Sequence, residues 1–118
     1  MDRKRLFQSV MEYAQGLNGA EVTYPFDETT LVLKVMGKMF LLAGEGGSSI
    51  SLKCNPWKSV ELQEIFAFVT PGYHLNKKHW ISVEIRPDMP LEFYKELIDH
   101  SYEEVVKKLP RKDRETLL

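Results

Sequence analysis

The chain has 118 residues, of which 43% are hydrophobic and 28% are charged, and its formal net charge at pH 7 is −1. This length predicts a single domain over residues 1–118, and the composition excludes a disordered chain. No apolar run approaches the roughly 20 residues that cross a bilayer, and the near-zero charge argues against a strongly basic protein dedicated to binding polyanions. The start of the chain lacks the apolar stretch of a secretory signal, and Cys54 is the single cysteine, so we expect a cytoplasmic protein with no membrane association.

The first part of the chain predicts a helix and then a short strand. Apolar residues recur at helical spacing between residues 2 and 17, and the Asn18-Gly19 pair ends this helix. Residues 21–26 contain β-forming side chains together with Pro25. Because proline cannot donate a hydrogen bond to a strand ladder, this segment predicts a strand at the edge of a sheet.

Three more strands are predicted to follow. Residues 29–35 are rich in β-branched and apolar side chains, and residues 39–43 return the chain, which makes a hairpin that turns at Gly37. The glycine-rich segment 44–49 lacks the Lys-Ser/Thr pair of a phosphate-binding P-loop, so we interpret it as a flexible loop. Residues 50–54 form the next strand.

The second half begins with a helix and a strand. Asn55 and Pro56 have the order of an N-cap and a first helical residue. The apolar stripe that follows predicts a helix reaching Val69, which residues 70–72 end. Residues 80–85 alternate in polarity and predict a strand.

The C-terminal third predicts helices. Pro90 opens a helix with one apolar side, and the spacing of Ser101 and Glu104 is that of a capping box, which predicts that the helix restarts there at a new angle. Residues 110–118 form a basic terminal turn or helix. The whole order is helix, about four strands, helix, strand and helices. Since strands pair in hairpins rather than alternate regularly with helices, the order predicts an α+β fold with a mainly antiparallel sheet backed by helices.

Residues 71–80, PGYHLNKKHW, are the densest group of chemically active side chains in the sequence. Zinc usually takes at least three protein ligands, so His74 and His79 alone do not predict a metal site. For nucleophilic chemistry, Ser101 is explained as a helix cap, Cys54 is explained as a small buried residue, and no GxSxG or HExxH pattern is present. We therefore expect no enzymatic activity, no cofactor and no metal.

Nucleic-acid binding has the stronger physical case for this segment. Its two adjacent lysines can neutralise phosphates, and Tyr73 or Trp80 can offer a ring for base stacking. Lysines on either side of the CNPW segment add to this patch if that segment lies nearby. The candidate nucleic-acid-binding residues are Lys53, Lys58, Tyr73, His74, Lys77, Lys78, His79 and Trp80. The alternative is structural: Trp80 begins a strand and belongs to the core, while Tyr73 and Leu75 hold the loop in place.

Five segments form a pattern over most of the chain. They are TYPF at 23–26, KVMGKMF at 34–40, SLK at 51–53, PGYHLNKKHW at 71–80 and SYEEVVKKLP at 101–110. In this order they resemble the bacterial MmcQ/YjbR-like family, and the decapeptide together with the later SY…KLP is the most specific part. The sequence departs from the family pattern at Asp27-Glu28, where glycine often follows the phenylalanine, and this affects the turn there.

The resemblance implies an α+β fold similar to secretion-chaperone-like domains. It also implies DNA binding through a double-wing arrangement of β-hairpins, and no established enzyme activity or cofactor. Our leading hypothesis is weak, sequence-tolerant binding of DNA or another nucleic acid through a local basic and aromatic patch. The alternative is a small protein-interaction module, whose partner pairs with a sheet edge or meets the acidic stretch 88–104. We expect a monomer or a weak dimer.

Overall fold

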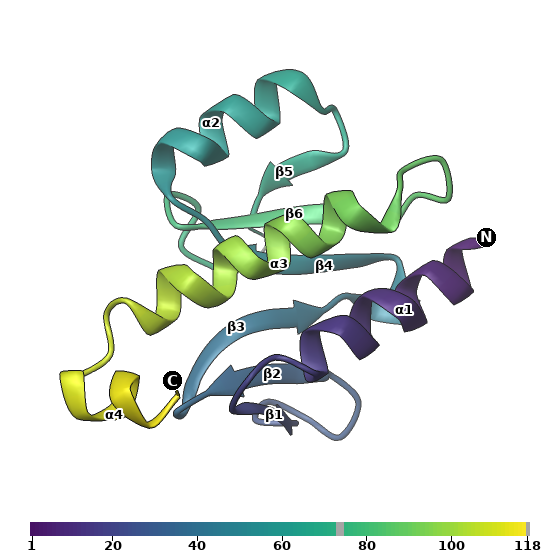
Figure 1. Cartoon of the computed structure of the whole chain (residues 1–118). Coiled ribbons are helices and arrows are strands. Elements are labelled where there is room, and N and C mark those ends of the chain that lie inside the picture. The colour runs from purple at the N-terminus through teal and green to yellow at the C-terminus, as the bar shows by residue number, and fades with distance from the viewer. Residues whose placement is uncertain (73–74, 118) are drawn as a thin grey trace.

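The chain folds into one sheet of six antiparallel strands with helices on one face (Figure 1). The computed structural model describes residues 1–72 and 75–117. In chain order the elements are α1 (Arg3–Gln15), β1 (Ala20–Thr23), β2 (Val32–Val35), β3 (Lys38–Ala43), the 3₁₀ turn η1 (Glu45–Gly47), β4 (Ser49–Lys53), α2 (Pro56–Ile65), β5 (Val69–Pro71), β6 (Trp80–Glu84), α3 (Leu91–Val106) and α4 (Arg111–Thr116). The strand order across the sheet is β1-β2-β3-β4-β6-β5. The predicted α+β class with an antiparallel sheet backed by helices is confirmed.

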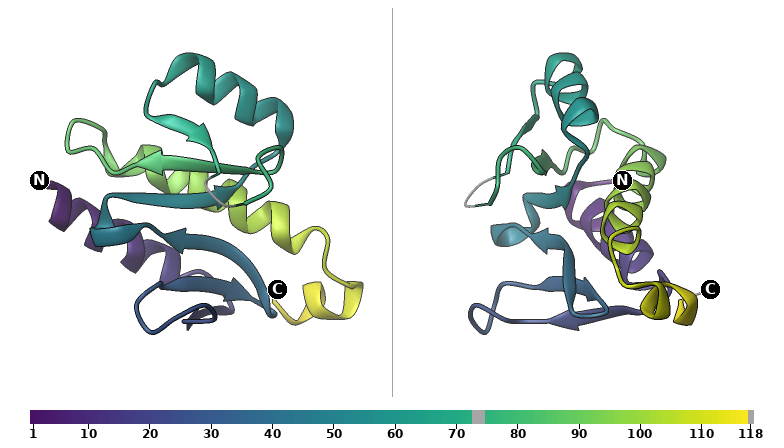
Figure 2. Two further views of the ribbon diagram at one scale, coloured as in Figure 1. Left: turned by 180° about the vertical axis from the view of Figure 1, so that it is seen from behind. Right: turned by 90° about the vertical axis from the view of Figure 1, so that its left-hand side faces the viewer.

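The two faces of the sheet differ in what covers them. Figure 2 shows α1 and α3 together on one side of the sheet, and no helix of the described chain lies on the opposite side. Strand β4 displays the difference, because Ile50 and Leu52 are fully buried while Ser49, Ser51 and Lys53 are only partly buried. Successive strand residues point to opposite faces, so the apolar set of β4 meets the helices and the polar set meets the open face or the end of the sheet.

The hydrophobic core fills the space between the sheet and the two covering helices. Helix α1 buries its apolar side, and α3 does the same along its length. The largest fully buried side chains are those of Tyr94, Phe40, Leu33, Leu41, Ile50, Leu52, Ile81, Ile85 and Ile98. Burial of each such side chain stabilises the fold by roughly 1.5–3 kcal/mol relative to exposure. This packing holds α1 and α3 on one face of the sheet.

The predicted hairpin around Gly37 is confirmed. Strands β2 and β3 pair with Val35 opposite Lys38, which leaves a two-residue loop of Met36 and Gly37. Both loop residues have positive φ angles, 50° and 78°. This geometry matches the right-handed twist of the flanking strands. The predicted edge strand is confirmed as well, because β1 lies at the edge of the sheet beside β2, and it ends two residues before Pro25.

The prediction that the second helix reaches Val69 is wrong. Helix α2 ends at Ile65, and Phe66 already has extended φ and ψ angles of −120° and 114°. Phe66 and Phe68 both pack against Phe93 of α3, with ring centroids 5.0 and 5.8 Å apart. The N–H of Val69 donates to the carbonyl oxygen of Phe66 at 3.1 Å, which closes a turn after α2. This turn leads directly into β5, where Val69 pairs with Val83.

The predicted restart of the third helix at Ser101 is also wrong. Helix α3 continues without a break for 16 residues. The Ser101 side chain is fully buried, and its hydroxyl donates to the carbonyl oxygen of Phe40 at 2.6 Å and accepts from the N–H of Lys53 at 2.9 Å. The serine therefore ties α3 to β3 and β4 instead of capping a helix. No helix of the described residues is both long and apolar enough to span a membrane.

Candidate nucleic-acid interface

Four elements meet at the end of the sheet that contains most of the predicted site residues. Strand β4 ends there and β6 begins there, with Lys53 opposite Trp80. The N–H of Cys54 donates to the carbonyl oxygen of His79 at 2.8 Å, which extends this pairing by one hydrogen bond. Helix α2 starts immediately afterwards because the Asn55 side chain accepts from the N–H groups of the next helical turn, as predicted for an N-cap. In Figure 1 the end of α3 lies on the same side of the molecule.

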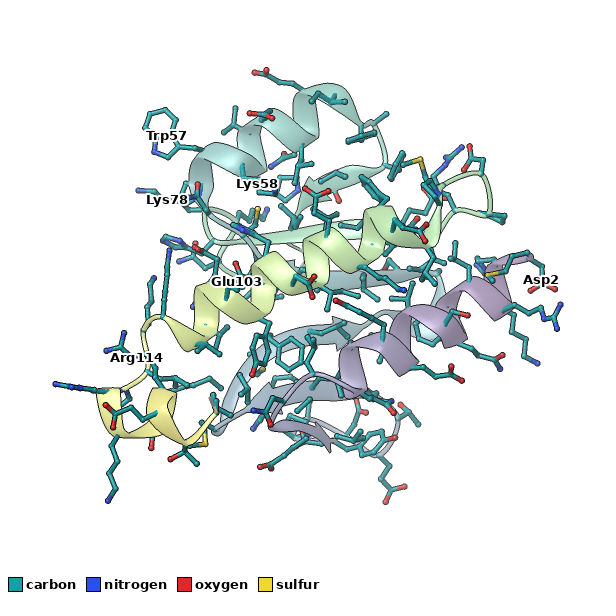
Figure 3. The ribbon with its side chains drawn as sticks, viewed as in Figure 1. Asp2, Trp57, Lys58, Lys78, Glu103 and Arg114 are labelled. Carbon is teal, nitrogen blue, oxygen red and sulfur yellow. The ribbon has the colours of Figure 1, made fainter. Side chains whose placement is uncertain are left out.

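A tight turn presents the two adjacent lysines of the decapeptide to solvent. The Asn76 side chain accepts from the N–H of Lys78 at 3.0 Å, and the N–H of His79 donates to the carbonyl oxygen of Asn76 at 3.1 Å. Lys77 and Lys78 are exposed at the top of this turn. Figure 3 shows Lys78 projecting from the left side of the molecule. These two cations are therefore free to approach a ligand.

The start of this loop is held close to β6. The N–H of Gly72 donates to the carbonyl oxygen of Trp80 at 2.9 Å. A Cβ atom at position 72 would lie 2.6 Å from the Cβ atom of Trp80, so only glycine fits without a shift of one segment. The next two residues, Tyr73 and His74, lie outside the described residues.

The Trp80 ring serves the core rather than base stacking. Its exposed fraction is 8%, so the prediction of a free stacking face is not supported for this residue, and the structural alternative holds. His79 is partly buried and its described hydrogen bonds are those of its backbone. The described aromatic residue with the most exposed ring near this end is Trp57, which is 86% exposed and was not among the predicted site residues.

Lys58 forms an ion pair with a carboxylate of α3. Its Nζ atom lies 3.6 Å from the carboxylate of Glu96 on α3, and 32% of its side chain is exposed. An ion pair at this distance reduces the positive potential that Lys58 offers to a ligand. The prediction that Lys58 contributes a free cation to the patch is therefore weakened.

Lys53 lies in a hollow with two lysines that the sequence did not single out. The hollow has a volume of about 460 Å³ and is lined by Lys38, Met39, Lys53, Trp80, Val105, Lys108 and Leu109. We call it the lysine hollow. Partial burial lowers the pKa of Lys53, and the charges of Lys108 and Lys38 lower it further, while Glu104 acts in the opposite direction. Lys38 and Lys108 are thus near enough to act on the charge of Lys53.

The carboxylate nearest to the lysine hollow is already engaged. Glu104 accepts a hydrogen bond from the Nζ atom of Lys107 at 2.5 Å. Burial tends to raise the pKa of Glu104, but this hydrogen bond and the charges of Lys107, His100 and Lys108 lower it overall. Within residues 1–72 and 75–117, no carboxylate is in ion-pairing contact with a lysine of the hollow. The hollow therefore keeps an excess of positive charge.

We define the basic end as the group of exposed or half-buried cations around these elements. It consists of Lys38, Lys53, Lys77, Lys78 and Lys108. Strand pairing at Lys53 and the hydrogen bond at His79 place the lysine turn beside the hollow. Two features of the sequence could have identified Lys38 and Lys108 as members of the basic end. In the hairpin of β3 and β4 the start of β3 lies beside the end of β4, and the KKLP segment lies at the end of the helix that packs on these strands.

Catalytic chemistry finds little support at this end. Burial raises the pKa of the Cys54 thiol to about 11, so the thiol stays protonated near neutral pH and is a poor nucleophile. Burial lowers the pKa of His100, whose Nε2 atom accepts from the N–H of Asn55 at 3.2 Å. The part of the chain that the structure describes contains no group of three His, Cys, Asp or Glu side chains suited to a metal.

Comparison with known proteins assigns the family. The model of the YjbR family matches residues 15–104. The chain belongs to the YjbR family. The predicted family is therefore confirmed.

Curated relatives of this YjbR-family chain match over nearly its whole length. The uncharacterized protein YbdF of Escherichia coli O157:H7 is 37% identical over 116 residues, which cover 97% of this chain and 95% of the relative. The uncharacterized protein YjbR of Escherichia coli K12 is 30% identical over 111 residues, which cover 92% and 94% of the two chains. These names state no activity, so they establish kinship and not function.

Solved structures have the same fold as this YjbR-family chain. The Deinococcus radiodurans protein DR2400, with a domain designated DUF419, is 35% identical, has a TM-score of 0.82, and the match covers 92% of this chain and 84% of that one. A protein from Pseudomonas syringae is 23% identical with a TM-score of 0.66 over 87% of this chain and 97% of that one. The second likeness concerns the fold alone.

Proposed function

We propose that this YjbR-family protein binds nucleic acid weakly and without sequence preference through the basic end, as a non-enzymatic protein of the cytoplasm. The observation that carries the proposal is the group of three lysines around one hollow, next to a turn with two exposed lysines. Each lysine that contacts a phosphate releases a condensed counterion, and this release drives binding whatever the base sequence. Because Trp80 is buried, its ring is not available for stacking on a base, so the affinity comes mainly from charge.

A titration of labelled DNA tests this proposal. Duplex and single strands are titrated with the protein at two salt concentrations, first with the unmodified chain and then with Lys77→Glu combined with Lys78→Glu. We expect a dissociation constant of about 10⁻⁴–10⁻⁶ M that rises steeply with salt, and a loss of at least about tenfold in the double variant. If binding persists unchanged in the double variant, the basic end is not the site.

A matched control separates a local effect from a change in total charge. Arg3 and Lys4 are exposed at the start of α1, on the opposite side of the molecule from the lysine turn. Arg3→Glu combined with Lys4→Glu changes the net charge by the same amount. We expect this variant to retain more affinity than the lysine-turn variant, and an equal loss in both would argue for a diffuse electrostatic effect.

A second candidate function is that of a small protein-interaction module. It is favoured by α2, where Trp57, Val60 and Ile65 are 86%, 57% and 62% exposed beside the exposed carboxylates of Glu61 and Glu64. Exposed aromatic and aliphatic side chains are typical centres of protein interfaces. This function predicts a partner whose binding is lost in Trp57→Ala and is retained in the lysine-turn variant, with no affinity for nucleic acid.

A further inference from the structure

The lysine hollow has the properties of a discrete anion site and not only those of a charged surface. Its volume of about 460 Å³ is within the range of about 300–1,000 Å³ that is usual for small-ligand sites. Since one water molecule occupies roughly 30 Å³ in the liquid, the hollow can hold more than an isolated phosphate group. Size and concavity therefore admit a small charged ligand together with the group that carries it.

The three ammonium groups come from three separate elements. Lys38 begins β3, Lys53 ends β4, and Lys108 lies two residues beyond the end of α3. The two strands are fixed by their pairing, and α3 is fixed to both through the Ser101 hydroxyl. The three lysines therefore line one hollow because the fold holds the backbones that carry them.

The walls of the hollow are apolar. Met39, Trp80, Val105 and Leu109 complete its lining, and three of these four side chains are buried. Apolar walls lower the local dielectric constant, so attraction between the lysines and an anion is stronger there than at an open surface. The same walls can contact the apolar part of a sugar or base.

We infer that the lysine hollow binds a terminal phosphate group, the phosphomonoester dianion at the end of a nucleic-acid strand or on a free nucleotide. The inference rests on the proposed function for the nature of the ligand and adds which part of it enters the hollow. A phosphomonoester has up to two negative charges and three terminal oxygens at neutral pH, which match three ammonium donors. A backbone phosphodiester has one charge and is flanked by sugar on both sides, so it fits a concave site with three cations less well.

The engagement of Glu104 supports this assignment. Its carboxylate interacts electrostatically with Lys53 and Lys108, but it accepts its hydrogen bond from Lys107. An anion that enters the hollow therefore does not have to displace an ion pair of the described chain. Binding of a dianion also offsets the unfavourable effect of Lys38 and Lys108 on the charge of Lys53.

Fluorescence of Trp80 reports on this site directly. The chain has two tryptophans, and Trp57 is 86% exposed on α2, so Trp57→Phe leaves Trp80 as the sole fluorophore with little expected effect on the fold. In this background tryptophan emission is excited selectively over that of the five tyrosines, and the protein is titrated with inorganic phosphate, a nucleoside monophosphate and its unphosphorylated nucleoside, at constant ionic strength with chloride. We expect saturable changes with phosphate and the monophosphate and none with the nucleoside.

Variants that remove one charge test whether the fluorescence change comes from ligand bound in the lysine hollow. Lys53→Met and Lys108→Met should each weaken binding of the monophosphate by about tenfold, the usual value of one charge-assisted hydrogen bond. Lys4→Met removes the same charge from the exposed side of α1 and should leave the affinity within about twofold. If all three variants behave alike, or if no phosphate compound gives a saturable change, the inference is wrong.

Oligonucleotides with different ends separate this inference from the proposed function. Strands of one sequence are compared with phosphate or hydroxyl at the 5′ end and at the 3′ end. A preference of at least about tenfold for a phosphate end supports both proposals. If all strands bind equally and the lysine variants weaken this binding, the proposed function is supported and the terminal-phosphate site is overturned. Binding of the monophosphate without binding of any strand overturns the proposed function and keeps the site for free nucleotides.

Discussion

Ser101 is the residue that fixes the candidate site to the core. Its hydroxyl satisfies the N–H of Lys53 and the carbonyl oxygen of Phe40, which lie on adjacent strands, and it is fully buried. A buried polar group without a partner costs about 1–3 kcal/mol, so this one side chain protects two backbone groups. It also determines where α3 sits relative to Lys53.

Replacement of this serine tests that role. Ser101→Ala should lower the free energy of unfolding by about 1–3 kcal/mol, because both backbone groups lose their partner inside the core. Urea unfolding followed by circular dichroism measures the change. Ser9→Ala, on the partly exposed side of α1, is the control and should stay within about 0.5 kcal/mol of the unmodified protein. Equal stability of the two variants would show that the hydroxyl has no structural role.

At the scale of elements, α1 and α3 are joined by one polar contact beside their apolar packing. The Tyr13 hydroxyl donates to the carboxylate of Asp99 at 2.5 Å, and the Nζ atom of Lys95 lies 5.1 Å from the centre of the Tyr13 ring. The hydrogen bond to Asp99, together with burial and the Asp99 charge, raises the pKa of Tyr13 from 10.0 to about 12. Folding therefore favours the protonated phenol.

This contact predicts a pH dependence of stability. Because the folded-state pKa is raised, the stabilisation is fully present below pH 10 and is lost as the pH rises through about 12. Tyr13→Phe should reduce the free energy of unfolding at neutral pH by about 1 kcal/mol and should flatten its decline between pH 10 and 12. Denaturant unfolding at several pH values measures both effects. Tyr24→Phe, at a position that is 50% exposed, should keep the decline, and a decline unchanged in Tyr13→Phe would contradict the assignment.

Which elements the sequence could predict depends on the range of the interactions that form them. The hairpin at Gly37 and the cap at Asn55 depend on neighbouring residues, and both were predicted correctly. Strand β5 depends on pairing with β6, where Val69 lies opposite Val83, 14 residues further along the chain. A local apolar pattern contains no information on such a contact, so the segment was assigned to a helix.

The candidate site also has one part that the local sequence predicts and another part that depends on tertiary packing. The two adjacent lysines are recognised from the local sequence, and the side chain of Asn76 shapes the turn that presents them. The lysine hollow was missed because Lys38, Lys53 and Lys108 meet only when β3, β4 and α3 are assembled. Lys58, by contrast, was assigned to the patch from its place in the sequence, and its ion pair with Glu96 depends on helix packing that the sequence does not display.

At the scale of the whole molecule, the basic end is a local group of five lysines in a chain with a net charge of −1. Strand β6 begins at the basic end and finishes at Glu84, and η1 places Glu45 beside that far end. In Figure 3, Lys78 and Arg114 lie on one side and Asp2 lies on the other. Attraction to an anionic polymer must therefore come from this local group, because the total charge provides almost none.

The salt dependence of DNA binding tests the central claim most directly. For the unmodified protein and for Lys77→Gln combined with Lys78→Gln, the logarithm of the association constant is measured against the logarithm of the salt concentration. If both lysines contact phosphates, the slope should become shallower by about 1.8 for duplex and about 1.4 for single strands, since each contact contributes about 0.9 or 0.7. Arg3→Gln combined with Lys4→Gln should leave the slope unchanged. Equal slopes for the unmodified protein and the lysine-turn variant would contradict binding through the basic end.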